Sequence, residues 1–173
     1  LLTERESDWD RKIKIKFYWT APRTGWYKLN IDGAFNRNDA SGCLEGVFRN
    51  QGNWTLGFTM KIISRAPIHA ELMALYQGLR IAKEKKLYPL EIETDATQVI
   101  KYIKEGCITY DSIIYSCRLL LSQMGTVVMR HNFRQGNEVA HLLAKHAKSI
   151  TTFINLEFLY FPPSFVMARM LAD

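Results

Sequence analysis

Cysteine and long uncharged hydrophobic runs are both scarce in this chain. Only three of its 173 residues are cysteines, Cys43, Cys107 and Cys117, and none of them has the spacing of a CxxC pair or a zinc site. An odd, sparse cysteine count is typical of a reducing compartment, so we expect an intracellular protein, nuclear or cytoplasmic. No uncharged run approaches the length that spans a bilayer and no signal peptide is visible, so we expect no membrane partner.

Internal repeats and low-complexity segments are lacking as well. Hydrophobic residues make up 47% of the chain and charged residues 23%, which are ordinary values for a globular protein. The length therefore predicts one domain with a real hydrophobic core. The first residue is Leu1 rather than Met, so we expect the chain to be part of a longer polypeptide.

Positive charge is in excess, with a formal net charge of +6. This excess favours a polyanionic partner such as a nucleic acid. Part of it lies in residues 1–18, which we interpret as a basic leader or linker because residues 11–16 are four Lys or Arg and two Ile. The leader either contacts nucleic acid or is simply solvated.

A strict alternation of apolar and polar side chains opens the predicted domain, which we place at residues 19–150. In residues 26–35 the two alternating sets are Tyr27, Leu29 and Ile31 on one face, and Lys28, Asn30 and Asp32 on the other. Residues 42–50 and 54–63 have the composition of two further strands. Because the connections are short, these three strands should form an antiparallel meander.

The period changes to that of a helix after Pro67, and strands and helices then alternate. We predict helices at residues 67–82, 96–106, 111–123 and 136–148, and strands at residues 90–94 and 126–133. This order predicts an α/β fold whose five-stranded mixed sheet has three antiparallel strands, then two parallel additions, with helices on both faces. Residues 151–173 form an aromatic tail with Phe158, Phe161 and Pro162-Pro163, which we expect to dock on the domain.

Three carboxylates occupy comparable places in this pattern. Asp32 lies within the first strand, Glu71 is predicted in the first turn of the first helix, and Asp95 stands where a strand enters a helix. The strand-to-helix junction is where α/β sheets build ligand sites. Clustered acids repel each other unless a cation lies among them, and hard oxygen ligands suit Mg²⁺. Two such ions can clamp the attacking and leaving oxygens of a phosphodiester.

Each acid also has an explanation that involves no ligand. Asp32-Gly33 is a hairpin turn signal, and Glu71 would complement the positive end of its helix. Asp95 would be an N-cap, because residues 95–98 have the spacing of a capping box. The order of the three acids along the predicted elements favours a shared site.

Four short motifs in order resemble the ribonuclease H family, and most closely the plant ribonuclease H-like domains related to retrotransposon polyproteins. The motifs are Asn30–Ala34, Ala70–Leu75, Glu93–Asp95, and Asn137–Ala140 followed by Leu142–Ala144. The resemblance covers roughly residues 19 to 173, and its specificity lies in the combination of motifs.

The resemblance implies a two-metal endonuclease that cuts the RNA strand of RNA–DNA hybrids and leaves a 5′-phosphate and a 3′-hydroxyl. Its cofactors would be two divalent ions, Mg²⁺ or Mn²⁺. The residues that hold the metals and act in catalysis would be Asp32, Glu71 and Asp95, with His141 at the place of a fourth ligand. Recognition would depend on phosphates and 2′-hydroxyls, with little sequence preference. Residues expected to contact nucleic acid are Gly33, Ala34, Arg37, Arg130, Arg134 and Lys145.

The chain departs from the family at two points. His141 stands where the family has its fourth acid, and Arg134-Gln135-Gly136 fills the loop where the family has a histidine, since His131 lies earlier. His141 lies off the apolar stripe of its helix, so it is either a metal ligand or a plain exposed histidine. Besides the active nuclease, two functions therefore remain open: a catalytically weakened module that binds nucleic acid, and a domain that binds a protein partner within a polyprotein.

Overall fold

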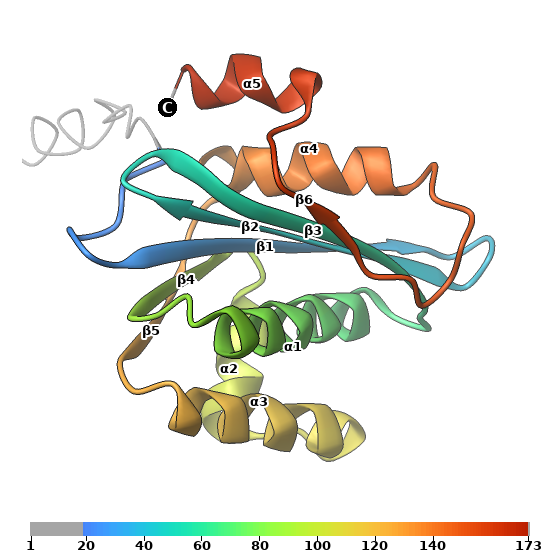
Figure 1. Cartoon of the computed structure of the whole chain (residues 1–173). Helices are drawn as coiled ribbons and strands as arrows, with labels where there is room; N and C mark the ends of the chain where they lie inside the picture. The colour runs from blue at the N-terminus through green and yellow to red at the C-terminus, as the bar shows by residue number, and fades with distance from the viewer. Residues whose placement is uncertain (1–18, 173) are drawn as a thin grey trace, which may run out of the picture.

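A six-stranded mixed sheet with helices on both faces forms the centre of the computed structural model, which describes residues 19–172 (Figure 1). The predicted basic leader at residues 1–18 lies outside the described residues. The elements are β1 (Tyr27–Asn36), β2 (Ser41–Asn50), β3 (Asn53–Ile63), α1 (Pro67–Lys85), β4 (Leu90–Thr94), α2 (Thr97–Glu105), η1 (Ile108–Tyr110), α3 (Asp111–Gln123), β5 (Val127–His131), η2 (Arg134–Asn137), α4 (Glu138–Ala147), β6 (Glu157–Leu159) and α5 (Ser164–Met170). None of the helices within residues 19–172 is both long enough and apolar enough to cross a bilayer.

The strands lie in the order β5-β4-β1-β2-β3-β6. β1, β2 and β3 pair antiparallel, β4 runs parallel to β1, and β5 runs parallel to β4. This confirms the predicted meander with two parallel additions. The β2–β3 connection is a two-residue hairpin loop, in which Gln51 and Gly52 both have positive φ, as a type I′ turn requires.

The sixth strand, β6, is the main difference from the prediction of five. It comes from the aromatic tail and pairs antiparallel with β3, with Phe158 opposite Phe58. The Trp54 indole N–H also donates a hydrogen bond to the Leu159 carbonyl at 2.9 Å. A strand of three residues is too short to show a period, and it covers an edge of β3 that would otherwise be unpaired.

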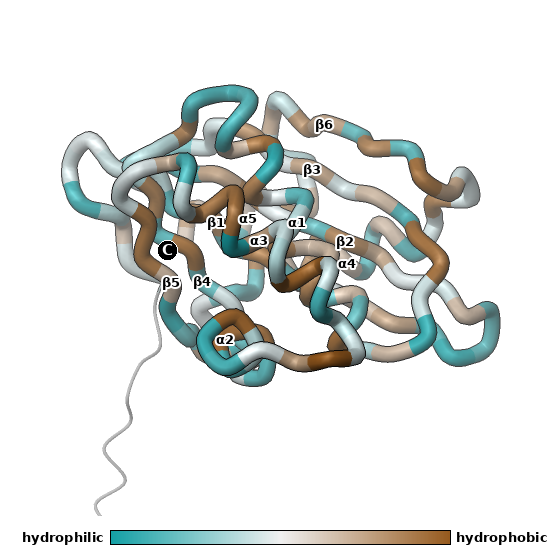
Figure 2. The backbone as a smooth tube through the Cα atoms, turned by 90° about the horizontal axis from the view of Figure 1, so that it is seen from below, coloured by the Kyte–Doolittle hydropathy of each residue, from teal (hydrophilic) through white to brown (hydrophobic). Residues whose placement is uncertain are grey.

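Apolar packing fills both sides of the sheet. The larger core lies between the sheet and α1, α2 and α3, and Leu29 and Ile31 of β1 are fully buried in it. On the other side, Val47 packs with Val139 and Leu143 of α4 and Val166 of α5. Figure 2 shows hydrophobic stretches within strands and helices, and hydrophilic backbone mainly in the loops around the rim. Helices therefore cover both faces of β1 and β2.

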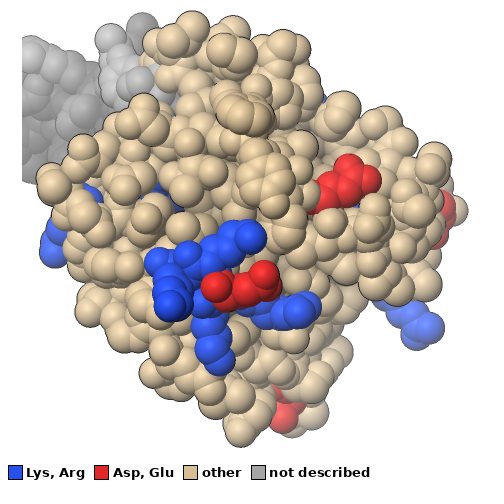
Figure 3. All heavy atoms as spheres, in the orientation of Figure 1, with Lys and Arg blue, Asp and Glu red and all other residues tan. Residues whose placement is uncertain are grey.

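Helix α1 begins at Pro67, as predicted, because proline suits the first helical position. It ends at Lys85, and the C-cap residue Lys86 adopts a left-handed conformation with φ 56°. Lysine side chains in the last turn complement the negative end of the helix. Figure 3 shows Lys and Arg gathered around an acidic side chain over the C-terminal half of α1. The prediction that Glu71 lies in the first turn is wrong, since Glu71 is the fifth helical residue.

Candidate functional site

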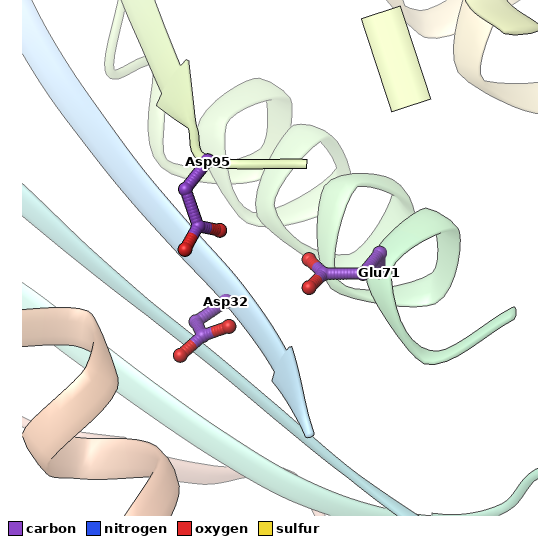
Figure 4. Close-up of side chains that lie close together, drawn as sticks. All are labelled: Asp32, Glu71 and Asp95. Carbon is purple, nitrogen blue, oxygen red and sulfur yellow. The ribbon is translucent and has the colours of Figure 1, made fainter. Parts of the chain in front are cut away.

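Three elements bring Asp32, Glu71 and Asp95 together. Asp32 lies in β1, Glu71 in α1, and Asp95 directly after β4, and their carboxylates point into one shared space (Figure 4). One oxygen of each lies within 4.8 Å of the others. The last parallel pair of β1 and β4 joins Asn30 to Glu93, and both aspartates lie two residues beyond that pair. The parallel register therefore places the two aspartates side by side.

Gly33 sets the distance between β1 and α1. A Cβ atom at this position would lie 2.5 Å from the backbone carbon of Ala70 and 2.5 Å from the backbone nitrogen of Glu71. Only a residue without a side chain permits that approach, and the approach places Glu71 next to Asp32. In the structure, Gly33 is in close contact with the α1 backbone. Its predicted contact with nucleic acid stays a prediction.

The explanations of the acids without a ligand are not supported by the structure. Asp32 is no turn residue, because it lies inside β1 and pairs with Glu45 of β2. Glu71 lies beyond the first helical turn. Asp95 does not cap α2: Ala96 occupies the N-cap position, and its N–H donates to the Thr94 hydroxyl at 3.1 Å.

Burial and neighbouring negative charges raise the pKa values of Asp32 and Glu71. Burial and the negative charge of Asp95 raise the pKa of Asp32, although His141 and the Gly33 N–H oppose this. Burial, Asp32 and Asp95 raise the pKa of Glu71 to about 9. The Glu71 Oε2 atom is also buried without a hydrogen-bond partner. Hard oxygen donors, mutual repulsion and an unpaired oxygen all fit a divalent cation, so the triad is a candidate metal site.

The metal-free protein should lose stability as the pH rises. The Glu71 carboxyl, with a pKa of about 9 in the fold against an ordinary value of 4.5, keeps a proton that the unfolded chain has lost. The free energy of unfolding should therefore fall across that range, by at most about 1.4 kcal/mol per pH unit from this group. Thermal melts in chelator across the range check this, and Glu71→Gln should flatten the dependence. A parent protein with constant stability would contradict the predicted repulsion.

His141 contacts the site directly. Its Nδ1 atom lies 3.2 Å from Asp32 Oδ2, and its Nε2 atom lies 2.8 Å from the Arg134 guanidinium. Because arginine only donates, Nε2 accepts that bond, and a neutral ring then carries its proton on Nδ1 and donates it to Asp32. The alternative of a plain exposed histidine is therefore wrong. His141 is not one of the three residues whose oxygens cluster, and its role as a metal ligand stays a prediction.

Asn137 stands at the N-cap position of α4, but its side chain does not cap the helix. Its Nδ2 atom donates to the Ile31 carbonyl at 2.8 Å. The side chain is buried, and Ile31 directly precedes Asp32. Asn137 therefore fixes the start of α4 beside the acidic strand and helps to place His141.

A buried polar network next to the site was missed by sequence reasoning. Glu93 accepts hydrogen bonds from Lys28 at 2.6 Å, Asn30 at 2.9 Å and Asn132 at 2.8 Å. It joins β1, β4 and the segment after β5, two residues before Asp95. The sequence does show Lys28 and Asn30 on the polar side of one strand and Glu93 on the polar side of another. Such alternation is usually interpreted as a side that faces solvent.

The expected nucleic-acid contacts are spread around the acids. Arg134 is in η2 and is linked to the acidic site through its hydrogen bond to His141. Lys145 lies four residues after His141 on α4. Arg37 is exposed in the β1–β2 turn, and Arg130 is exposed on β5. Ala34 lines a small hollow with lysine side chains from β3 and from the end of α4. The structure thus brings Arg134 to the site and leaves the other contacts as predictions.

Known proteins share both the sequence pattern and the fold. Residues 30–147 match the family model described as Reverse transcriptase-like. The Arabidopsis thaliana protein At1g65750 is 33% identical to this chain over 144 residues. Its name assigns it provisionally to the ribonuclease H proteins. That match covers 81% of this chain but only 23% of the length of its relative.

Two solved structures show the same architecture. Ribonuclease H1 of the archaeon Halobacterium salinarum NRC-1 superposes with a TM-score of 0.64 at 24% identity, covering 72% of this chain and 98% of that one. Ribonuclease H1 LC11, isolated from compost, was solved with an RNA/DNA hybrid. It superposes with a TM-score of 0.63 at 18% identity, covering 70% and 95% of the two chains. These likenesses confirm the predicted α/β ribonuclease H-like fold, and with the family model they show that the chain belongs to the ribonuclease H-like family as a reverse transcriptase-like member.

Proposed function

We propose that this domain is a divalent-metal-dependent endonuclease that cuts the RNA strand of RNA–DNA hybrids. The observation that carries the proposal is the convergence of Asp32, Glu71 and Asp95, whose carboxylate oxygens lie within 4.8 Å of one another. A second support is the shared fold with ribonuclease H1 LC11, which was solved with a hybrid bound.

The three acids would hold two divalent ions, Mg²⁺ or Mn²⁺. When bound, such ions supply the charge that activates a water molecule and stabilises the leaving oxygen of a phosphodiester. The protein's own part is to fix the carboxylates: Gly33 admits α1, the Glu93 network holds β4 against β1, and Asn137 holds α4. Arg134 and Lys145 carry positive charge on the side of His141, where phosphates would lie.

A second function is favoured by the contact between His141 and Asp32. A neutral imidazole brings no negative charge to the metals, and its two nitrogens already pair with Asp32 and Arg134. This is the arrangement expected of a catalytically weakened module that binds nucleic acid or a protein partner, derived from a retrotransposon polyprotein.

One experiment separates these functions. The protein is incubated with a hybrid labelled on its RNA strand, first with Mg²⁺ and then with Mn²⁺, with double-stranded DNA and double-stranded RNA as controls. Cleavage of only the hybrid's RNA strand supports the nuclease. Binding of the hybrid without cleavage in either metal would support the weakened module.

Hybrid binding should weaken steeply as salt rises, because phosphate contacts release counterions. Neutralising Arg130 and Arg134 to Gln should reduce the slope of log affinity against log salt, by about 0.7 to 0.9 for each phosphate that the variant no longer neutralises. Fluorescence anisotropy with a labelled hybrid and a chelator measures this slope without cleavage.

The matched control for that pair is Lys85→Gln with Lys86→Gln. These residues lie at the end of α1 opposite to Glu71, roughly 20 Å along the helix axis. Their neutralisation should leave the slope unchanged. A slope that falls in the control but not in the arginine pair would place the nucleic-acid surface at the C-terminal end of α1.

A further inference from the structure

Glu45 is a fourth acid beside the site. It lies in the middle of β2, and the antiparallel register pairs it directly with Asp32 of β1. Directly opposed residues point to the same face of a sheet, with Cβ atoms about 4.5–5.5 Å apart. Asp95, Asp32 and Glu45 therefore follow one another across three neighbouring strands, β4, β1 and β2.

The Glu45 side chain is fully buried and has no partner. Its exposed fraction is 0%, and neither carboxylate oxygen accepts or donates a hydrogen bond. Leaving a buried carboxyl unpaired costs stability, so an ordinary structural role would require a nearby donor. Other buried acids of this sheet have one: Glu91 lies 3.0 Å from Lys28, and Glu93 accepts three hydrogen bonds.

The surroundings of Glu45 are those of the metal site. Burial, with the negative charges of Asp32 and Glu71, raises the pKa of Glu45 well above its ordinary value, and Lys148 opposes this only weakly. Two of the three clustered acids thus act on Glu45 through space. Two unpaired, buried oxygens beside an acidic cluster are donors suited to a cation.

We propose that Glu45 is a fourth carboxylate of the metal site. It would bind the same ion as Asp32, to which the neutral His141 contributes no negative charge. This rests on the proposed metal site. The oxygens that lie within 4.8 Å of one another in the structure are those of the other three acids. In this proposal the Glu45 carboxylate turns toward Asp32 about its side-chain torsions when an ion enters.

Glu45→Gln tests this without relying on activity, because glutamine keeps the shape and removes the charge. Calorimetric titration with Mn²⁺ should show the weaker binding event of the parent reduced by about 10- to 100-fold. The rise in melting temperature that Mn²⁺ gives the parent should shrink in the variant. Without metal the two melting temperatures should be close, which shows that the fold is intact.

Two further variants make the result decisive. Glu91→Gln changes another buried glutamate of the sheet, whose partner is Lys28, and it should leave Mn²⁺ affinity unchanged. Asp32→Asn should abolish the binding of at least one ion. If Asp32→Asn weakens Mn²⁺ binding while Glu45→Gln binds Mn²⁺ as the parent does, the Glu45 inference is wrong and the proposed three-acid metal site is supported. If the parent binds no ion, or Asp32→Asn binds as the parent does, both are wrong.

Discussion

Replacing Asp32 by Asn should abolish cleavage of the RNA strand while leaving the fold intact. Asparagine keeps the shape of the side chain but loses the charge that holds metal, so we expect a loss of at least about a thousandfold, or roughly 4 kcal/mol of transition-state stabilisation. Burial and the charge of Asp95 raise the pKa of Asp32, so a neutral amide at this position should not destabilise the metal-free protein. A gel assay of RNA cleavage and a thermal melt in chelator measure the two effects.

The matched control for Asp32→Asn is Asp111→Asn, which removes an exposed acid from the first turn of α3. It should cut hybrids at the parent rate. Unfolding of Asp32→Asn would show that Asp32 is needed for the fold. Cleavage at the parent rate would show that the Asp32 charge binds no metal that catalysis requires. Either result would remove the main support for the site.

Changing His141 to Asp should increase cleavage in Mg²⁺ by one to two orders of magnitude. A carboxylate there would lie near Asp32 Oδ2, where His141 Nδ1 now stands at 3.2 Å, and would add a hard oxygen ligand. Imidazole suits later transition metals better than Mg²⁺, so the parent should be more active in Mn²⁺ than in Mg²⁺. The expected gain corresponds to roughly 1.4 to 2.7 kcal/mol of transition-state stabilisation.

His146→Asp is the control for this gain. His146 lies on the same helix, is exposed, and packs against Phe165 at a ring distance of 5.0 Å, so its change adds the same charge elsewhere. It should not increase cleavage. If His141→Asp is no more active than the parent in Mg²⁺, the missing fourth acid does not limit this site, and a contribution of Glu45 to the same ion would explain why.

The elements could be predicted because their signals are local. The alternation in residues 26–35, the helical spacing after Pro67 and the alternation in residues 90–94 each reflect one period over a short window. These gave β1, α1 and β4 within a few residues of their observed bounds. Asp95 could be placed from chain order, because it stands where a strand enters a helix and such junctions build ligand sites in α/β sheets. The positions of Asp32 inside β1 and Glu71 within α1 depend on strand register and helix packing.

What could not be predicted depends on register and packing. Glu45 faces Asp32 only because β1 and β2 pair with that register, and a slip of one residue would turn it to the other face. The role of the Asn137 side chain could not be predicted either, because its bond to Ile31 crosses from the start of α4 to β1. Alternation in β1 separates its two faces but does not show what covers the polar one, and Lys28 and Asn30 are fully buried beneath partners from distant segments.

The most direct test of the proposed function is to start the reaction with metal alone. The parent protein is mixed in chelator with a hybrid labelled on both strands, and excess Mn²⁺ is then added. A hybrid-specific two-metal nuclease should cut the RNA strand only after the addition, leave 5′-phosphate and 3′-hydroxyl ends, and keep the DNA strand whole. A hybrid that stays bound with both strands intact after the addition would contradict the proposed nuclease.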